Sequence, residues 1–343
     1  MNILNLPNNL NYFSKKNILI TGGTGTIGNE LTSFLLDTDV SKICIFSRDE
    51  FKQHQMKIKF KNHKNYDKLR FFIGDIRDLE RLNYALKNTN LVFHTASLKQ
   101  VDSIEYNPME AIKTNILGTN NIITACINNN VDQLIGISTD KCCSPVNLYG
   151  GTKLIFEKLI INAFEHSGYK LKTCILRYGN VINSRGSVIP IFNKQKNKGF
   201  FTVTHKEMTR FTITIQEARN FILNCVILSS GGEIFIPKLP SYSILQLCNI
   251  INPKNEIRII GLRYGEKIDE EMVSVNESNY TFENNKFFII EPSYGLNKDF
   301  IIKNNLKKKD SSFSYNSKDN IFIEDSILLK QINEIDFGNC STR

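Results

Sequence analysis

Residues 21–28 form the stretch Thr21-Gly22-Gly23-Thr24-Gly25-Thr26-Ile27-Gly28, which directly follows the apolar run Asn17-Ile18-Leu19-Ile20. Apolar residues at Leu31, Phe34 and Leu35 then predict a helix. Glycines with this spacing permit a tight turn, close approach of a pyrophosphate, and close packing of the helix on the strand. The phosphates would lie at the helix N-terminus, where unpaired amides and the helix dipole favour anions. Strand, glycine-rich turn and helix in this order predict a dinucleotide-binding unit.

Further strands and helices alternate along the first half of the chain. Short apolar runs predict buried strands at residues 42–46, 69–73, 91–93, 133–137 and 174–176, and a long helix is expected over 108–130. This alternation predicts an α/β fold, a doubly wound parallel-sheet Rossmann domain with a smaller C-terminal mixed α/β substrate domain. We expect the Rossmann domain over 12–183, with a returning segment near 211–236. The substrate domain would cover mainly 184–343, partly interleaved, and residues 1–15 would form a frayed arm.

Composition narrows the class of protein and its partners. The chain has 343 residues, 41% of them hydrophobic and 22% charged, and no apolar run approaches the length of a membrane span. Without a signal pattern at the N-terminus, we expect a cytoplasmic protein. Most of the eight cysteines lie inside apolar runs, so no disulfide and no metal site is expected. The net charge of +9 comes from scattered lysines without a nucleic-acid motif, which favours an anionic small substrate over nucleic acid.

The end of the second strand is where a dinucleotide enzyme selects its cofactor. There the sequence reads Ser47-Arg48-Asp49-Glu50-Phe51-Lys52. An acidic residue at this place binds the ribose 2′-hydroxyl, whereas an arginine accommodates a 2′-phosphate. Arg48, supported by Ser47 and Lys52, favours NADP, and Asp49 keeps NAD as the alternative.

The ends of the third and fourth strands should also face the cofactor. Asp75 could accept a hydrogen bond from the adenine amino group, or it could cap a helix, a role that Asp78 fits better. The loop that contains Thr95 and Lys99 should pass beneath the nicotinamide ribose. His94 is better explained as a structural histidine than as a catalyst. Asn115, on the long helix, could bond the backbone near the active-site strand, or it could equally be an ordinary helix residue.

The fifth strand leads into Ser138-Thr139-Asp140-Lys141, and the next helix carries Tyr149 and Lys153. Residues four apart lie on one face of a helix, so Lys153 should lie beside Tyr149 and lower the pKa of its phenol from about 10. Such a tyrosine can take a proton from a sugar hydroxyl. The spacing alone also fits a surface pair. The acid and amine at the strand end, with the nucleotide turn upstream, favour catalysis.

Arginines in the second half of the chain suggest a diphosphate site. Arg185, Arg210 and Arg263 are expected in exposed loops, and arginine suits bidentate recognition of phosphates. Each one alone would also fit a surface salt bridge. Together, in the part expected to cap the cofactor domain, they predict binding of UDP.

These motifs resemble the extended short-chain dehydrogenase/reductase superfamily, and within it the inverting UDP-N-acetylglucosamine 4,6-dehydratases of pseudaminic acid biosynthesis. The resemblance extends from about residue 12 to beyond 320, and rests on residues 20–25, 47–50, 74–82, 138–141, 147–150, 177–181, 184–188 and 208–211. Simple epimerases of the superfamily lack the Asp140-Lys141 pair, and membrane-anchored retaining dehydratases typically have Met in place of Tyr149. The chain departs from the family at residues 95–97, at Cys142-Cys143 and at Tyr264.

The resemblance implies a mechanism. Tyr149, assisted by Lys153, would remove the proton of the 4-hydroxyl while a hydride passes from carbon 4 to NADP. Thr139 would bond the 4-oxygen. Lys141, as a neutral amine, would remove the proton from carbon 5, and Asp140 would protonate the departing 6-hydroxyl. The hydride would return to carbon 6, and reprotonation of carbon 5 on the opposite face would invert it.

The expected protein is thus a hydro-lyase that opens the synthesis of pseudaminic acid or a related surface glycan, as in flagellin glycosylation. It would be a homo-oligomer, a dimer or a hexamer. The predicted cofactor-binding residues are Gly22, Thr24, Gly25, Thr26, Ile27, Gly28, Ser47, Arg48, Asp49, Glu50, Phe51, Lys52, Asp75, Ile76, Thr95, Lys99, Tyr149, Lys153 and Val181. The predicted substrate-binding residues are Lys99, Ser138, Thr139, Asn180, Arg185, Gly186, Ser187, Val188, Arg210, Arg263 and Glu266. The alternatives are a UDP-sugar 4-epimerase or reductase, or a non-enzymatic dinucleotide-sensing module.

Overall fold

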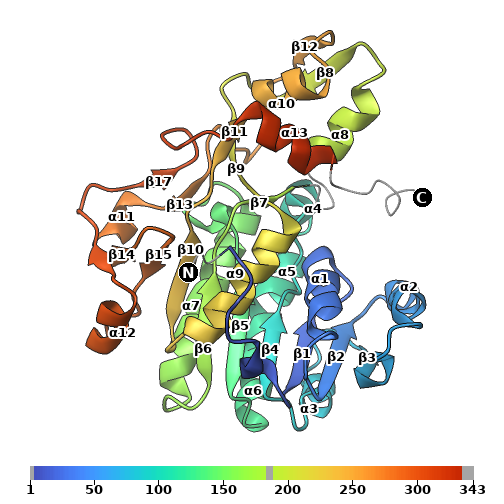
Figure 1. The fold of residues 1–343 in the computed structure, drawn as a ribbon, viewed down its shortest axis with the longest axis vertical. Helices are drawn as coiled ribbons and strands as arrows, with labels where there is room; N and C mark the ends of the chain where they lie inside the picture. Colours follow the sequence, from blue (N-terminus) through green and yellow to red (C-terminus); the bar gives the residue numbers. More distant parts are fainter. Residues whose placement is uncertain (1–3, 183–187, 334–343) are drawn as a thin grey trace.

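The computed structural model describes residues 4–182 and 188–333. Its largest feature in this part of the chain is a ten-stranded sheet with the order β16-β14-β15-β10-β6-β5-β4-β1-β2-β3 (Figure 1). Seven of these strands run parallel: β1 (Asn17–Thr21), β2 (Lys42–Ser47), β3 (Leu69–Ile73), β4 (Leu91–His94), β5 (Gln133–Ile137), β6 (Lys172–Leu176) and β10 (Glu233–Pro237). The predicted doubly wound sheet is confirmed, and its strand order reverses between β1 and β4.

Helices cover both faces of the parallel part. One face carries α1 (Thr26–Leu35) and α9 (Ile215–Leu228), which pack on each other (Figure 1). The other face carries α3 (Leu79–Ala85), α6 (Gly118–Asn128) and α7 (Leu148–His166), and α6 packs against both α3 and α7. The remaining helices of this half are η1 (Leu10–Phe13), α2 (Glu50–Phe60), η2 (Tyr66–Lys68), α4 (Val101–Tyr106), α5 (Pro108–Ala111), the π-helix η3 (Ile112–Leu117) and η4 (Asp140–Cys142). The helix expected over 108–130 is thus one segment with a π-helical turn inside it.

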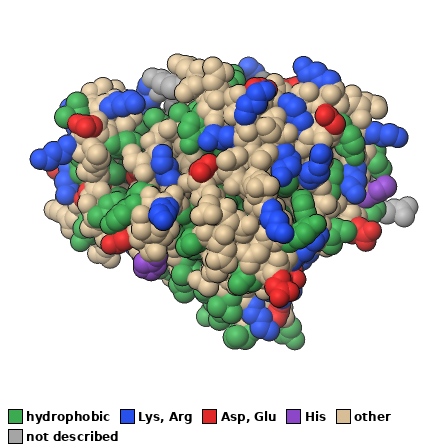
Figure 2. Space-filling view, turned by 90° about the horizontal axis from the view of Figure 1, so that it is seen from below, with side chains coloured by type: hydrophobic (Ala, Val, Ile, Leu, Met, Phe, Trp, Pro, Cys, Tyr) green, Lys and Arg blue, Asp and Glu red, His purple; other side chains and the backbone are tan. Residues whose placement is uncertain are grey.

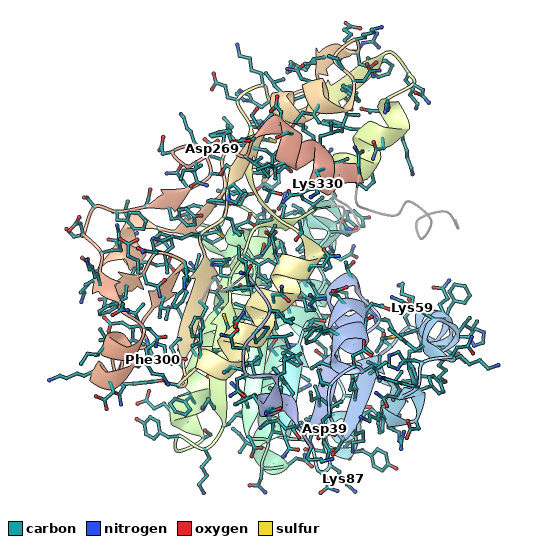
Figure 3. All side chains as sticks on the ribbon, viewed as in Figure 1. Asp39, Lys59, Lys87, Asp269, Phe300 and Lys330 are labelled. Atoms are coloured by element: carbon teal, nitrogen blue, oxygen red, sulfur yellow. The ribbon has the colours of Figure 1, made fainter. Side chains whose placement is uncertain are left out.

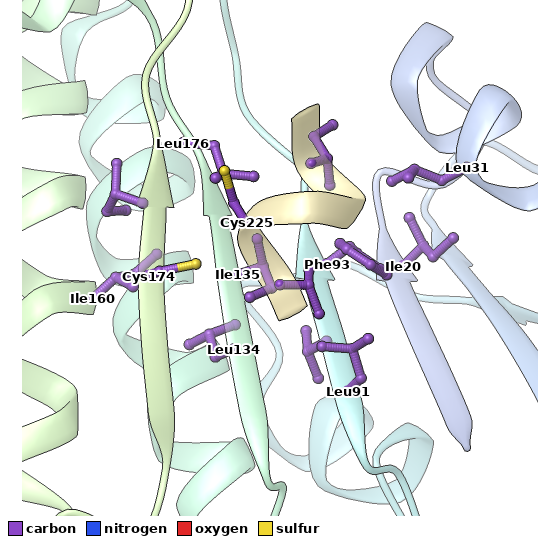
Figure 4. Close-up of a cluster of buried hydrophobic side chains, with 14 of the residues drawn as sticks. Ile20, Leu31, Leu91, Phe93, Leu134, Ile135, Ile160, Cys174, Leu176 and Cys225 are labelled. Atoms are coloured by element: carbon purple, nitrogen blue, oxygen red, sulfur yellow. The ribbon is translucent and has the colours of Figure 1, made fainter. Parts of the chain in front are cut away.

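The core lies between these layers (Figure 4). Ile20, Phe93, Ile135 and Leu176 of neighbouring strands are fully buried, and α9 adds Cys225 from the helical layer. Parallel strands are buried on both faces, so their sequences are continuous apolar runs rather than alternating ones. This explains why the runs at β1, β2, β4, β5 and β6 could be recognised from sequence.

The second half of the chain joins the large sheet in two places. α9 and β10 return to it, and three antiparallel strands extend it beyond β10, namely β15 (Phe287–Ile290), β14 (Thr281–Glu283) and β16 (Lys307–Lys308). Short sheets form from β7 (Asn180–Val181), β9 (Thr209–Ile213) and β11 (Ser241–Ser243), from β8 (Phe200–Val203) and β12 (Glu256–Ile259), and from β13 (Glu271–Val273) and β17 (Tyr315–Asn316). The other helices are α8 (Val188–Gln195), α10 (Ile244–Ile251), α11 (Val275–Ser278), α12 (Lys298–Lys303) and α13 (Asp325–Asn333).

A separate apolar cluster builds the upper lobe of Figure 1. It joins α8, β8, α10 and α13 through buried residues that include Phe192, Phe201, Leu247 and Leu328. This lobe stands over the carboxyl ends of the parallel strands, the edge where doubly wound sheets bind their ligands.

The frayed N-terminal arm predicted from sequence is wrong for the described residues 4–15. Phe13 is fully buried, and Tyr12 donates a hydrogen bond of 2.7 Å to Gln133. The side chains of Asn220 and Asn224 on α9 donate to the backbone carbonyls of residues 4 and 5. The arm therefore fastens α9 to the sheet.

The exposed basic side chains are dispersed on the face shown in Figure 2, and the described cysteines are buried. On the face shown in Figure 2, Lys and Arg side chains are scattered among other polar groups rather than gathered in one patch. Seven cysteines lie in the described part of the chain, all buried and with free thiols. Among the described helices none is long and apolar enough to cross a membrane.

Candidate active site

A cavity of about 780 Å³ lies between the carboxyl ends of the parallel strands and the upper lobe. The strand ends supply one wall, from the glycine-rich turn after β1 to the segment after β5. α8, β9 and the loop 263–267 supply the other wall. A cavity of this size is within the range of small-molecule and cofactor sites.

The glycine-rich turn forms one end of the cavity. Gly22 has φ of +62°, and a Cβ at this position would lie 2.8 Å from the Cα of Ala96. A Cβ on Gly28 would collide with the backbone of Gly23, so this glycine permits α1 to pack closely on β1. Gly25 is the N-cap of α1. The turn therefore fits a pyrophosphate at a helix N-terminus.

At the end of β2, the two candidate cofactor-selecting residues have different surroundings. Asp49 caps α2, accepts from the backbone N–H of Lys52 at 2.9 Å, and also forms an ion pair with the Lys52 ammonium. Arg48 lines the cavity with 56% of its side chain exposed, and within the described part of the chain its ion pair is a long one of 3.8 Å to Asp75. Asp75 in turn accepts a hydrogen bond from Arg77. Burial acts to raise the pKa of Asp75, but Arg77 outweighs it and holds this pKa below its usual range. Asp78 caps α3, as predicted.

Two buried side chains hold the loop that follows β4. His94 contacts Thr21 and Thr119, and burial lowers its pKa to about 3, so it is a neutral structural histidine as expected. Asn115, on the π-helical turn, accepts from the backbone N–H of Leu98 at 2.8 Å and donates to the Leu98 carbonyl at 2.9 Å. Its amide also donates to Thr152 on α7, so this single side chain ties the loop to the tyrosine helix. π-turns are frequent at functional sites.

Tyr149 and Lys153 both line the cavity, but their expected electrostatic coupling is not found. Burial raises the pKa of Tyr149 to about 12, while Lys141 and Thr139 act only partly against this rise. The Lys153 ammonium instead donates to the carbonyl oxygen of Ile137 at 2.6 Å, and burial lowers the pKa of Lys153 to about 7. The prediction that Lys153 lowers the pKa of Tyr149 is therefore wrong for this state, because desolvation outweighs the charge.

The segment after β5 forms a short helical turn, η4, that presents the acid and the amine. The Lys141 ammonium lies 3.0 Å from Asp140 Oδ1 and 3.0 Å from Glu270 Oε1. Although burial acts to lower it, the two carboxylates raise the pKa of Lys141 above its ordinary value. Burial, together with Glu270, raises the pKa of Asp140. The expected neutral amine is thus wrong for this state: Lys141 is an ammonium ion between two carboxyl groups.

Backbone contacts explain how α7 reaches this turn. Asn147 caps the helix by accepting from the backbone N–H of Gly150 at 2.8 Å. A Cβ on Gly150 would collide with the carbonyl oxygen of Lys141, so glycine permits the close approach. Asn147 also donates to the carbonyl of Gly265 at 2.7 Å, and this bond joins the start of α7 to the loop 263–267.

Arg210 differs from the expected exposed loop arginine. It lies on β9 with 7% exposure, and its guanidinium donates to the backbone carbonyls of Thr209, Lys267 and Ile268 at 2.6–3.0 Å. Its Nε is 3.7 Å from Glu270. Arg210 therefore fixes the segment 267–270 beside Lys141, while Arg263 is exposed at the cavity rim, as expected.

A buried ion network joins η4 to neighbouring elements. Arg177, at the end of β6, pairs with Glu157 of α7 at 2.6 Å and with Glu277 of α11 at 2.9 Å. Cys142 donates its thiol to Glu157 at 2.9 Å, and Cys143 lies 3.4 Å from Glu277. These contacts join η4 to the C-terminal half of the chain.

The structure brings most of the predicted site residues to this one cavity. Those that line it are Gly22, Thr24, Gly25, Thr26, Ile27, Ser47, Arg48, Asp49, Lys52, Asp75, Ile76, Thr95, Lys99, Ser138, Thr139, Lys141, Tyr149, Lys153, Asn180, Val181, Val188, Arg210, Arg263 and Glu266. Gly28 and Asp140 lie behind the lining, and Glu50 and Phe51 point elsewhere, Phe51 being 67% exposed. Arg185, Gly186 and Ser187 lie outside the described residues.

Sequence reasoning missed several lining residues. Glu270 and Tyr242 are buried beside Lys141, while Phe192 and Met208 supply apolar walls from the upper lobe. Glu270 stands in the sequence Asp269-Glu270-Glu271, where only the fold decides which carboxylate turns inward. Figure 3 labels its neighbour Asp269, between the large sheet and the upper lobe. The sequence signal nearest to Glu270 is the pair Glu266-Lys267, of which Glu266 was predicted to bind substrate.

Comparisons with known proteins identify the family of this chain. The family model for polysaccharide biosynthesis proteins matches residues 18–292. A Campylobacter jejuni protein named UDP-N-acetylglucosamine 4,6-dehydratase (inverting) is 44% identical over 94% of this chain and 98% of its own length. A Rickettsia rickettsii protein named UDP-glucose 4-epimerase is 44% identical over 77% of this chain and 80% of its own. The crystal structure of Pen from Bacillus thuringiensis superposes with a TM-score of 0.86 at 37% identity, over 94% of this chain and 98% of that one. The chain belongs to the polysaccharide biosynthesis protein family and, as its motifs indicated, to the group that contains the inverting UDP-N-acetylglucosamine 4,6-dehydratases.

Proposed function

We propose that this protein is an NADP-dependent UDP-N-acetylglucosamine 4,6-dehydratase that inverts carbon 5. The observation that carries this proposal is that Lys141 lines one cavity with Tyr149 and Lys153, while Asp140 lies directly behind that lining, 3.0 Å from the Lys141 ammonium. An oxidation at carbon 4 needs only the tyrosine and its lysine. A carboxylic acid and an amine beside them supply the second proton-transfer pair that elimination of water needs.

The residues would share the work as follows. A bound nicotinamide supplies the acceptor and later the donor of a hydride. Tyr149 takes the proton of the 4-hydroxyl, and Thr139 bonds the 4-oxygen. Lys141 takes the proton from carbon 5, which the 4-ketone has made acidic, and Asp140 gives a proton to the departing 6-hydroxyl. Because Lys141 is held as an ammonium ion, its own proton must first pass to a neighbouring group.

NADP is favoured over NAD by the geometry after β2. The carboxylate of Asp49 is engaged by the Lys52 backbone and ammonium, so it is poorly placed to accept a ribose hydroxyl. The half-exposed guanidinium of Arg48 at the cavity wall suits a 2′-phosphate, which arginine binds by charge-assisted hydrogen bonds. The glycine-rich turn, where a Cβ would fill the cradle, fits the pyrophosphate.

The nucleotide sugar would extend toward the upper lobe. Arg263 and Glu266 lie at that end of the cavity with Asn180 and Val188. We assign the sugar-nucleotide contacts mainly to residues 184–343 and the cofactor to residues 12–183 with 211–236. The pathway would be that of pseudaminic acid or a related surface glycan such as that on flagellin, with a homo-oligomeric enzyme acting in the cytoplasm.

A UDP-sugar 4-epimerase is the second candidate, since the Rickettsia relative carries that name at the same identity. An epimerase has no use for an acid and base that act at carbons 5 and 6. One substrate distinguishes the two activities. Incubation with UDP-N-acetylglucosamine gives a 4-keto-6-deoxy sugar if the protein is a dehydratase, the first candidate. It gives only the 4-epimer, with carbon 6 still carrying its hydroxyl, under the second.

A further inference from the structure

Glu270 is a buried carboxylate for which the roles above have no use. Its side chain is 3% exposed, it lines the cavity, and Oε1 lies 3.0 Å from the Lys141 ammonium and 3.7 Å from Arg210 Nε. Its backbone is fixed by Ser317, which accepts from the Glu270 N–H at 2.9 Å and donates its own N–H to the Glu270 carbonyl at 2.8 Å. The backbone contacts with Ser317 therefore fix the position of Glu270 beside Lys141.

The outer oxygens of the two carboxyl groups are the second observation. Glu270 Oε2 and Asp140 Oδ2 are both buried, and neither has a hydrogen-bond partner among the described residues. A buried polar atom without a partner costs free energy and commonly marks a site of function. Here both orphaned atoms belong to the groups that bracket one ammonium ion.

We propose that Glu270 is the positioning residue of the elimination step: it receives the proton that Lys141 must release, and its charge keeps a proton on Asp140. The inference rests on the dehydratase function proposed above. In this inference Asp140, Lys141 and Glu270 each have a separate proton-transfer role, which the Asp140-Lys141 pair alone cannot provide. With only one carboxylate, the proton leaving Lys141 and the proton needed by the leaving group would compete for one site.

The proton balance of the step is simple. An N–H bond of the Lys141 ammonium breaks and an O–H bond forms on Glu270, along the 3.0 Å contact and without any net charge. The neutral amine then takes the proton from carbon 5, and the electron pair of that bond enters the enolate of the 4-ketone. The Asp140 O–H bond breaks and its proton joins the 6-hydroxyl. The electron pair of the enolate forms the double bond between carbons 5 and 6 as the bond from carbon 6 to oxygen breaks, and water leaves.

The charges around the cluster support this assignment. Two carboxyl groups that share one site cannot easily both ionise, so their pKa values move apart. Although burial opposes it, Lys141 and Arg210 lower the pKa of Glu270, whereas burial and Glu270 raise the pKa of Asp140. The proton therefore rests on Asp140. The other charged or titratable groups facing the cluster are Arg210 on β9, Lys267, Tyr149 on α7, Tyr242 on β11 and Cys142.

The test is the pH profile of kcat for Glu270→Gln, measured with UDP-N-acetylglucosamine. Glutamine keeps the shape and the acceptor but removes the charge, so the pKa values of both Lys141 and Asp140 fall. Both limbs of the profile should move to lower pH by about one unit or more, whichever group each limb reports. Glu270→Asp keeps the charge and should leave the limbs in place, at a lower maximum. A merely structural role would lower the whole profile without moving it.

A second readout separates the steps. Glu270→Gln should still form NADPH absorbance from oxidation at carbon 4, while deuterium uptake from solvent at carbon 5 slows at least about tenfold. The matched control is Glu271→Gln, since Glu271 bonds Ser144 at 2.7 Å and lies outside the Lys141 cluster. Its limbs should not move.

The outcomes are distinct. Unmoved limbs in Glu270→Gln, or equal loss of oxidation and of deuterium uptake, would overturn the role of Glu270 while leaving the enzyme a dehydratase. A wild-type protein that forms neither NADPH nor the 4-keto product overturns the function itself. If Glu270→Gln does not fold, Glu270→Asp decides, because moved limbs there contradict a role of the charge.

Discussion

The ammonium of Lys153 lies 2.6 Å from the carbonyl oxygen of Ile137, at the end of β5, and is 2% exposed. This contact fastens the tyrosine helix to the strand that carries the acid and the amine. It also places Lys153 over the ring of Phe156, 3.3 Å from its centroid. Lys153 thus has a structural partner before any ligand binds. Because burial lowers the pKa of Lys153, the contribution of this residue to the free energy of unfolding depends on pH.

Lys153→Met should change the pH dependence of stability. The pKa of Lys153 is about 7 in the folded chain against 10.5 ordinarily, because burial disfavours the charge. Between these values the unfolded chain binds more protons, so the free energy of unfolding of the wild type rises with pH relative to the variant. The rise is about 1.4 kcal/mol per pH unit. Chemical denaturation from pH 6 to 9.5 measures it, with Lys158→Met on the exposed face of α7 as control. A constant difference would show that Lys153 titrates normally.

Arg48→Ala should weaken NADP binding about 10- to 100-fold, because a charge-assisted bond to a phosphate contributes about 1.5–3 kcal/mol. Binding of NAD should change less than about threefold. Titration calorimetry with both dinucleotides measures the difference. Arg81→Ala is the control, since Arg81 donates to the Ile73 carbonyl outside the cavity. Equal loss for NADP and NAD would remove the 2′-phosphate from the role of Arg48.

Glu277→Gln should lower the free energy of unfolding by about 1.5–3 kcal/mol at pH 7, because Arg177 loses one of its two ionised partners. Although burial opposes it, Arg177 lowers the pKa of Glu277 to about 2. The contribution is therefore full above about pH 4.5 and is lost as the pH falls toward 2. Glu283→Gln, which removes partly exposed ion pairs to Lys238 and Lys309, should cost less than about 1 kcal/mol. Equal costs for the two variants would contradict the buried network.

Lys141→Met and Tyr149→Phe should fail at different steps. A lost general base commonly lowers the rate about 10²–10⁴-fold. Lys141→Met should stop the loss of water and deuterium uptake at carbon 5, yet still form NADPH absorbance on addition of substrate. Tyr149→Phe should abolish that absorbance as well. Near-normal dehydration by Lys141→Met would assign the base to another group.

The sequence revealed more of the strands than of the electrostatics. β3 and β5 begin and end where their apolar runs predict. β5 is buried along most of its length, and strands buried on both faces have an unbroken apolar signal. The glycine-rich turn was equally recognisable, since Gly22 has a positive φ of +62° and a Cβ on Gly28 would collide with the backbone of Gly23 in the same turn. Local patterns of this kind need no knowledge of the rest of the fold.

What the sequence did not reveal depends on partners far away in the chain. Glu270 is 129 positions from Lys141 and carries no motif, yet together with Asp140 it raises the pKa of that amine. Arg210 looked like an exposed phosphate ligand and instead holds backbone carbonyls. The Lys153 amine donates to the carbonyl oxygen of Ile137, although the phenol of Tyr149 is only four residues away in the sequence. Burial and long-range pairing set the pKa values of these groups, and neither can be predicted from the spacing of residues in the sequence.

The central claim is tested most directly by proton NMR of the product that the purified protein forms from UDP-N-acetylglucosamine and NADP in D₂O. The account predicts a UDP-2-acetamido-2,6-dideoxy-4-keto sugar with a methyl group at carbon 6, deuterium at carbon 5, and inverted configuration there. A product that keeps its 6-hydroxyl and differs only at carbon 4, or a 4-keto sugar with carbon 5 retained, would contradict it.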